Sequence, residues 1–381
     1  MKKWILFGVI VLLTFFNCTN TQNKNVIIPE DLNFKIPENL QKDIYKSLNT
    51  LFEDIDSKGT SLLIDKENSG ITLELFKFLK TIEYRSIKPI KVLAKASKVS
   101  KKRYLLEITY MKSDSKGNSI TNAICSLIAI KRSDKIFFSS PIGFHTADWK
   151  NQIIGKINYH YKEKFNQNVA EKFNTNNSKI STKLGLKTEN LFFYKCSDYQ
   201  EVLRIMGVSY SSKPNEDTQS STIINNTIIS GLNSEDFSHD IFHFYSSKLF
   251  KSENRNWTTE EGLAYSWGNA YYTKNENEMI TRDELVFHLK KYLDENQDED
   301  FLTLFFKNPR IFKTLSSKVS LKSTISSLLC DEVEDEKGID GIKVLINCGK
   351  GDDNFFKTLD ELIGINKDNF NTKIKKILER Y

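Results

Sequence analysis

The sequence predicts an α+β protein with a small N-terminal domain and a larger second domain that ends in helices. Without its first 17 residues the chain still has about 360 residues, enough for two hydrophobic cores. Two helical patterns precede a series of β-like runs in the first part, and the patterns after Tyr272 are mostly helical. Strands and helices that are segregated along a chain are typical of the α+β class.

The N-terminus has the features of a targeting segment. Lys2 and Lys3 precede an apolar run, Trp4–Phe16, which is shorter than the ~20 residues of a membrane-spanning helix. A charged start and an apolar middle are typical of a secretory signal. Cys18 follows at once, as in the lipobox of bacterial lipoproteins, although Phe15-Phe16-Asn17 replaces the usual Leu and small residues. We expect lipid on Cys18 to anchor the protein to a membrane; an ordinary signal peptide is the alternative.

Composition shifts divide the rest of the chain. Pro141 and Gly143 end the β-rich part, and an Asn/Thr-rich stretch precedes the first helix. Loss of Lys2 and Lys3 with the signal lowers the formal charge from +6 to +4, and acids and bases are interleaved, so no nucleic-acid partner is indicated. The expected division is signal peptide 1–17, tether 18–35, N-terminal α+β domain 36–146 and second domain 147–381.

Apolar spacing predicts the elements of both domains. In the first domain we expect helices at Glu38–Ile55 and Leu73–Leu79, a hairpin turn at Gly117-Asn118, and strands at Ile90–Ala96, Arg103–Met111, Ile120–Ile130 and Lys135–Ser140. In the second we expect strands at Ile153–Tyr161, Leu191–Tyr194 and Thr222–Ser230, and helices at Asn166–Leu184, Tyr199–Met206, Arg282–Leu293, Ile339–Asn347, Asn354–Leu362 and Phe370–Leu378. A further helix, with Ser234 as its N-cap, carries the residues considered next.

Two histidines have the spacing of metal ligands. His239 and His243 are four residues apart in His-Asp-Ile-Phe-His, so a helix would place both on one face. A third ligand would come from the next helix, in Trp257-Thr-Thr-Glu-Glu-Gly-Leu-Ala-Tyr265. Glu260 and Glu261 lie about 100° apart around that helix, so only one of the two can face the metal. This is the pattern of H-E-x-x-H zinc sites, in which the Glu is a general base.

Plainer interpretations of these residues remain open. The two histidines could be ordinary helix residues, and Glu261 could be an acid in the first turn of its helix, where negative charge is favourable. We expect Trp257 and Leu263 to bury the apolar side of that helix. The other histidines, His145, His160 and His288, lack partners in the sequence and are expected to be structural or exposed.

Asp240 stands where the catalytic Glu would be. Its side chain is one methylene shorter, roughly 1.5 Å at the carboxylate. A misplacement of about 1 Å can cost on the order of 100-fold in rate. Asp240 could act through an additional water or hold a neighbouring group by a hydrogen bond. Zinc binding would then survive without efficient hydrolysis.

Residues 149–381 resemble the peptidase-MA-like, gluzincin-type lipoproteins of bacteria. The most specific match is the His239-x-x-x-His243 pair with Glu261-Gly; weaker matches are Trp149-Lys-Asn-Gln-Ile-Ile-Gly155, Phe193-Tyr194 before Tyr199-Gln-Glu201, Met206-Gly-Val-Ser-Tyr210, and the helices around Gly338-Ile-Asp. The resemblance implies a thermolysin-like metallopeptidase domain, zinc held by His239, His243 and Glu261, and a peptide or protein substrate. The catalytic Glu of the family has no match here.

Two functions follow as hypotheses. The first is an envelope-anchored lipoprotein, facing the periplasm or the surface, with a zinc-dependent metallopeptidase-like domain that is weakly active or inactive because of Asp240. The second is a non-catalytic binding or assembly lipoprotein on a degenerate peptidase fold. Cysteine zinc sites are not indicated, because Cys125, Cys196, Cys330 and Cys348 show no CxxC spacing. Cys330 and Cys348 are close enough in sequence for a disulfide; buried free thiols are the alternative.

Overall fold

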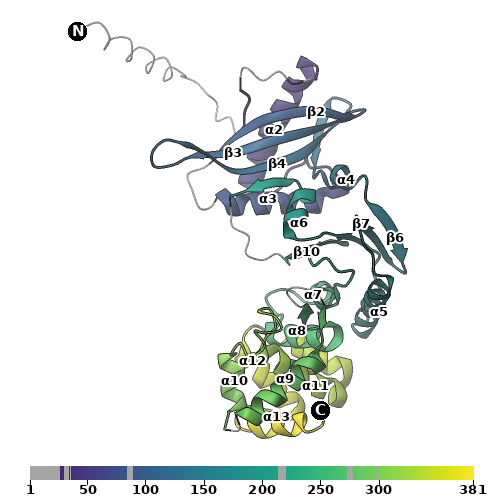
Figure 1. Ribbon diagram of the computed structural model, residues 1–381, viewed down its shortest axis with the longest axis vertical. Coiled ribbons are helices and arrows are strands. Elements are labelled where there is room, and N and C mark those ends of the chain that lie inside the picture. The colour runs from purple at the N-terminus through teal and green to yellow at the C-terminus, as the bar shows by residue number, and fades with distance from the viewer. Residues whose placement is uncertain are drawn as a thin grey trace, which may run out of the picture. The chain divides into compact units, whose positions relative to one another are not determined.

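The computed structural model describes residues 26–29, 34, 36–83, 89–212, 220–272, 278–296 and 298–381. They form helices and sheets, so the protein is α+β (Figure 1). Two units are present: Met1–Ala147 with Leu203–Glu216, and Asp148–Val202 with Asp217–Tyr381. The expected signal peptide and Cys18 lie outside the described residues. Within the described residues, no helix has both the length and the apolar character to cross a membrane.

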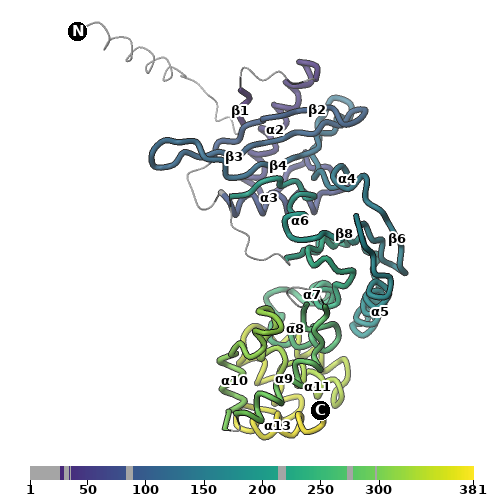
Figure 2. The backbone as a smooth tube through the Cα atoms, viewed as in Figure 1, coloured from purple at the N-terminus to yellow at the C-terminus, as the bar shows by residue number. Residues whose placement is uncertain are grey.

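A six-stranded sheet is the centre of unit 1. Its order is β1-β2-β3-β4-β5, and β9 also pairs with β4. The neighbours are antiparallel except β1 and β2, which are parallel. The long strands β2, β3 and β4 lie side by side in Figure 2. The strands are β1 (Val26–Ile27), β2 (Ile90–Ser100), β3 (Arg103–Ser113), β4 (Ser119–Arg132), β5 (Lys135–Ser139) and β9 (Val208–Ser211).

The predicted helices and hairpin of unit 1 are present. Helix α2 (Glu38–Lys58) buries its apolar stripe and ends at Gly59, whose φ is 72°. The helices α3 (Ser69–Glu83) and α4 (Ile142–His145) and the 3₁₀ turn η1 (Lys66–Asn68) complete the unit. Gly117 has φ 82° in the β3–β4 turn, where the carboxylate of Asp114 accepts from the backbone N–H of Asn118.

The tether expected at 18–35 is partly corrected. Val26 is fully buried and pairs with Lys91 on β2, so the described part of this segment belongs to the folded unit. Its apolar side chains explain the difference, because Val26 and Phe34 are buried in unit 1. Composition alone suggested a tether because the surrounding residues are polar.

A mixed five-stranded sheet lies in unit 2, in the order β10-β11-β8-β7-β6. Its central pairs, β7 with β8 and β8 with β11, are parallel, and both outer pairs are antiparallel. The strands are β6 (Lys150–Ile154), β7 (Ile157–Tyr161), β8 (Leu191–Lys195), β10 (Ser221–Ile224) and β11 (Thr227–Ser230). A further two-stranded pair consists of β12 (Tyr271–Tyr272) and β13 (Met279–Ile280).

Two predicted single strands are hairpins instead. The expected strand Ile153–Tyr161 breaks at Gly155, with φ 56°, and Thr222–Ser230 breaks at Asn225, with φ 53°. Positive φ is the geometry of two-residue hairpin turns, and Gly and Asn adopt it at the lowest cost. A continuous apolar pattern across each turn hid the break.

Helices make up the rest of unit 2. They are α5 (Gln167–Lys183), α7 (Ser238–Leu249), α8 (Trp257–Leu263), α9 (Arg282–Glu295), α10 (Phe301–Lys307), α11 (Leu321–Ile346), α12 (Asp352–Ile363) and α13 (Phe370–Leu378). Helix α6 (Tyr199–Met206) begins in unit 2 and ends in unit 1. Sequence analysis missed α10 and the first half of α11. Helix α11 is kinked at Gly338, with φ 65°, and only the part after the kink was predicted. One hydrophobic core joins the sheet to these helices through Phe193, Phe242, Leu263 and Ile325.

Candidate metal centre

Helix α7 carries the two histidines. It begins at Ser238, so the prediction that Ser234 caps it is wrong. The N-cap residue is Phe237, whose side chain makes no capping hydrogen bond. The fully buried Asp236 supports the first turn instead, because its carboxylate accepts from the backbone N–H of Ser238 at 3.2 Å and from the Ser238 hydroxyl. The opposite side of the helix is anchored in the core by Ile241, Phe242 and Tyr245. This packing fixes the face that bears both histidines.

Helix α8 supplies the carboxylate. Asn256 caps it by accepting from the backbone N–H of Thr259 at 3.1 Å. Glu260 is buried and paired with Arg255, at 3.1 Å, and with the hydroxyl of Ser246. The adjacent Glu261 points to the other side, toward the histidines.

The structure brings His239, His243 and Glu261 together. Their ligand atoms all lie within 4.8 Å of one another, so the cluster could hold a metal ion. Nε2 of His239 lies 3.8 Å from Oε2 of Glu261, and Nε2 of His243 lies 3.2 Å from Oε1. Two imidazoles and one carboxylate are a donor set that zinc accepts, with a fourth position left for another ligand.

The two imidazoles differ in the hydrogen bonds that leave a ring nitrogen free to bind a metal. Nδ1 of His239 lies 3.0 Å from the backbone carbonyl of Asn269, which favours a proton on Nδ1 and leaves Nε2 as the acceptor. Both ring nitrogens of His243 are buried without a well-directed hydrogen bond to any described residue, and Nε2 has only the ion pair with Glu261. A buried polar atom without a partner is costly. A metal ion at Nε2 of His243 would satisfy one of these atoms.

Opposite pKa shifts show how strongly the cluster is coupled. Burial lowers the pKa of His243, but the neighbouring Glu261 carboxylate outweighs burial and raises that pKa above its usual value. Burial raises the pKa of Glu261, but His243 and the charge of His239 hold it below the usual value. Glu261 therefore stays ionised although it is largely buried, which suits binding to a cation.

A π-helical turn, η2 (Ala264–Gly268), positions the carbonyl behind His239. A Cβ at Gly268 would lie 2.2 Å from the backbone oxygen of Ser238, so only glycine allows this approach of the two segments. Asn269 follows directly and directs its carbonyl to the imidazole. Sequence reasoning missed Asn269. The Gly268-Asn269 pair after the helix is the feature that could have indicated it.

A cavity of about 300 Å³ opens beside the cluster. Asp240 lines it but is outside the set of converging ligand atoms. Trp257 also lines it, and its indole stacks on the imidazole of His243, with ring centres 5.3 Å apart and 9° between the planes. The indole is 65% exposed, so the expectation that Trp257 is buried is wrong, because the rings stack at the cavity instead of in the core. The remaining lining residues are Ser220, Ser221, Leu232, His239, His243, Glu261 and Tyr271.

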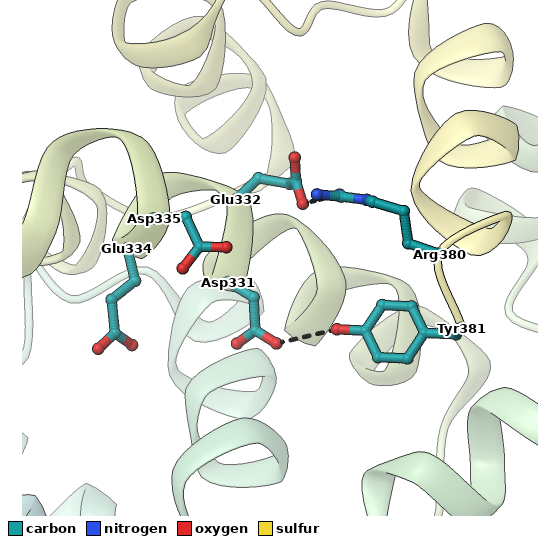
Figure 3. A pocket seen from close by; sticks show the side chains of 6 residues that line it. All are labelled: Asp331, Glu332, Glu334, Asp335, Arg380 and Tyr381. Carbon is teal, nitrogen blue, oxygen red and sulfur yellow. Dashed lines mark hydrogen bonds and ion pairs between the residues drawn. The ribbon is translucent and has the colours of Figure 1, made fainter.

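A second hollow, of about 210 Å³, lies where α11 meets the end of the chain (Figure 3). The acids that line it accept hydrogen bonds from the residues around η2. Asp331 accepts from Ser266, and Glu334 accepts from the indole N–H of Trp267 at 2.7 Å. Asp331 also accepts from Tyr381 at 3.3 Å (Figure 3). These acids therefore help to hold the π-helical turn behind His239.

The remaining histidines and the cysteines lie outside the cluster. His160 stacks on Tyr194, with ring centres 4.6 Å apart, and His145 and His288 are half-buried. The cysteines in the described residues are free thiols, so no disulfide joins Cys330 and Cys348; Cys125, Cys196 and Cys330 are buried, and Cys348 is half-buried.

Comparisons with protein-family models, with curated proteins and with solved structures find no match for this chain. The geometry of the cluster is therefore the basis for a function.

Proposed function

We propose that unit 2 binds one zinc ion through His239, His243 and Glu261, and that it is a thermolysin-like, metallopeptidase-like domain. The observation that supports this most is the convergence of two imidazoles and a carboxylate, whose ligand atoms all lie within 4.8 Å of one another. A mixed sheet and two ligand-bearing helices that share one hydrophobic core support the proposal of a thermolysin-like architecture. The resemblance to peptidase-MA-like lipoproteins points to the same three residues.

Different residues of this chain would orient the ligands, hold the ligand helix and supply a base in such a site. Bound zinc would polarise a carbonyl and lower the pKa of a water molecule. Asn269 orients His239, and the first-turn contacts of Asp236 fix the start of α7. Asp240 faces the same cavity, where a general base is needed, but with a side chain roughly 1.5 Å shorter than Glu. Weak or absent hydrolysis follows from that difference.

Metal analysis of the purified full-length protein tests the zinc site. We expect one zinc per chain after reconstitution and dialysis, and no stoichiometric zinc in His243→Ala. The matched control is His288→Ala, which removes a histidine from α9 of the same unit and should retain the metal. Circular dichroism of both variants separates loss of a ligand from loss of the fold. A wild-type protein that stays metal-free while folded would remove the proposal.

A non-catalytic binding or assembly function is the second candidate, and Asp240 is the observation that favours it. The two candidates share the zinc site and differ in turnover. A general peptidase assay on the zinc-loaded protein distinguishes them, because measurable hydrolysis that His243→Ala abolishes supports the enzyme. A zinc-loaded protein without turnover supports the binding function.

We also propose that the protein is a lipoprotein of the cell envelope, anchored through lipid on Cys18 and facing the periplasm or the surface. The charged start, short apolar run and immediate Cys support this. Cys18→Ser should move the protein from the detergent phase to the aqueous phase, or block its maturation. Unchanged partitioning would contradict the anchor.

A further inference from the structure

The cavity beside the metal cluster has an aromatic wall. Trp257 begins α8, one helical turn before Glu261, and its indole lies parallel to the His243 imidazole. One face of the indole is covered by this stack, yet the side chain is 65% exposed. The exposed area therefore belongs to the other face and the edges. An indole face that meets solvent at a cavity attracts planar or cationic groups.

The same cavity has a carboxylate that is not committed to another group. Asp240 is partly exposed, and the described residues offer it no hydrogen bond or ion pair. Glu261 faces the histidines as a ligand, whereas Asp240 is not among the converging ligand atoms. No Lys or Arg is among the described residues that line the cavity. Among the lining residues, the Asp240 carboxylate therefore has no Lys or Arg partner with which a bound cationic group would compete.

Of the groups that a peptide side chain can offer, a guanidinium group is the one that best fits a cavity with an indole face and an acceptor carboxylate. A guanidinium group is planar, stacks on aromatic rings and donates two parallel hydrogen bonds to a carboxylate. An ammonium group can use the same two features, but only as a point charge. A neutral apolar side chain would use the indole and leave the carboxylate unpaired.

We propose that Trp257 and Asp240 form a subsite for a basic side chain, arginine before lysine, in a peptide bound at the metal cluster. This inference rests on the proposed function for the presence of a peptide. It gives Asp240 a role in recognition, whether or not it is an efficient base. Both residues act by contact with the ligand.

Calorimetric titration of the full-length, zinc-loaded protein with two amides tests the subsite. Acetyl-arginine amide and acetyl-citrulline amide have nearly the same shape and differ in charge. We expect the arginine compound to bind about tenfold more tightly, the scale of one desolvated cation–π contact. Trp257→Leu and Asp240→Asn should each reduce that preference to about threefold or less, and Asp240→Glu should retain it because the charge remains.

Two matched variants control for general effects of lost aromatic or acidic groups. Phe287→Leu removes a side chain that is 66% exposed on α9, and Asp294→Asn removes an exposed acid from the same helix. Both should keep the wild-type preference. Acrylamide quenching of the wild type and of Trp257→Leu locates the ligand, because the difference between the two reports the exposed Trp257 indole, whereas Trp149 and Trp267 are buried. The arginine compound should shield it.

The outcomes separate the subsite from the zinc site. Equal affinities for the two amides in a protein that holds zinc overturn the subsite and leave the zinc proposal intact. The wild type could also prefer arginine and yet take up no zinc after reconstitution while it stays folded. That result supports the subsite and removes the zinc proposal. A preference that survives both Trp257→Leu and Asp240→Asn, or that Phe287→Leu abolishes, also overturns the subsite.

Discussion

At the scale of single residues, the length of the Asp240 side chain determines how well the proposed zinc site could hydrolyse a peptide. The residue follows a metal-ligand candidate directly and lines the cavity, so it has the position of a general base. A base must come within hydrogen-bond distance of the proton that it takes. A shorter side chain lowers turnover without disturbing ligands on the same helix. Metal binding and catalysis can therefore be separated at this position.

Asp240→Glu should raise peptide hydrolysis by up to about 100-fold, the cost associated with a misplacement of about 1 Å. The zinc content should not change, because Asp240 is not among the ligand atoms. The measurement is kcat/KM with a quenched fluorescent peptide, together with metal analysis of the same samples. Robust hydrolysis by the wild type that falls in Asp240→Glu would show a site built around Asp.

Side-chain roles could be predicted from sequence where helix geometry alone decides them. Residues four apart share a face, which predicts the His239–His243 pair. Neighbours lie about 100° apart, so only one of Glu260 and Glu261 could face the same metal, and the family resemblance pointed to Glu261. Asn269 could not be found in this way, because it acts through a backbone carbonyl that the fold brings from 30 residues away. Trp257 was expected to be buried, since stacking at a cavity depends on tertiary contacts.

At the scale of elements, the short π-helical turn η2 connects the candidate metal centre to the core. It follows α8 without a break, and its last residue, Gly268, touches the first turn of α7. Local π-helical turns are rare and often occur at functional sites. Here the turn directs the Asn269 carbonyl toward His239, so a change in the turn should be detected at the metal.

Gly268→Ala should weaken zinc binding. The new Cβ would lie 2.2 Å from the Ser238 backbone oxygen, so η2 and α7 must move apart and His239 loses its acceptor. Loss of such an orienting contact costs about 10- to 100-fold in metal affinity. Competition with a zinc chelator measures the change. Gly143→Ala is the control, because its Cβ would meet nothing within 4 Å. Equal zinc affinity in both variants would contradict the role of η2.

Strand β7 contains a histidine whose titration should affect stability. His160 stacks on Tyr194, and its Nε2 is buried without a hydrogen bond to any described residue. Burial lowers the pKa of His160 below its usual 6.5. The folded state then binds fewer protons than the unfolded state, so the free energy of unfolding decreases as the pH falls from above 6.5 toward the folded-state pKa.

His160→Phe should flatten this pH dependence while it keeps an aromatic ring against Tyr194. Urea midpoints between about pH 5 and 8 measure the slope, and the wild type should lose more stability on acidification than the variant. Burial, and after it the charge of Arg204, also lowers the pKa of His145. The titration of His145 contributes equally to the slopes of both proteins, so it cancels when the slopes are compared. Equal slopes would show that His160 does not contribute.

Element boundaries were predictable where a stop residue coincided with the end of an apolar pattern. Helix α12 ends at Gly364, which has φ 64°, and the pattern ends there too. The β6–β7 and β10–β11 turns were missed because apolar residues continue on both sides of Gly155 and Asn225. Short α10 and the first half of α11 were missed because their apolar faces are defined by packing in the core of unit 2.

At the scale of the whole molecule, the two units are interleaved along the chain. The sequence predicted a single domain boundary near residue 146, and a boundary between the two units does fall between Ala147 and Asp148. The chain then returns to unit 1 at Leu203, so that β9 can pair with β4. No local pattern indicates such a return, because the residues that pair, such as Ile124 and Tyr210, are far apart in sequence.

A chain cut between Ala147 and Asp148 should therefore stay together. The piece that starts at Asp148 contributes β9 to the sheet of the other piece. There, the backbone N–H of Ser126 donates to the Gly207 carbonyl at 2.6 Å and that of Ser212 donates to Asn122 at 2.8 Å. A protease site inserted at this exposed junction allows the test. After cleavage, both pieces should elute together in size-exclusion chromatography and separate only in denaturant.

Gly207→Ala gives this test a matched variant. Gly207 has φ 120°, and a Cβ there would lie 2.6 Å from the Ser126 backbone oxygen, so alanine must push β9 away from β4. The cut Gly207→Ala protein should then release its two pieces at a lower urea concentration than the cut wild type. The uncut proteins should differ less, because the intact chain keeps β9 at a high local concentration beside β4. Pieces of the wild type that separate in native buffer would show that β9 does not hold the interleaved chain together.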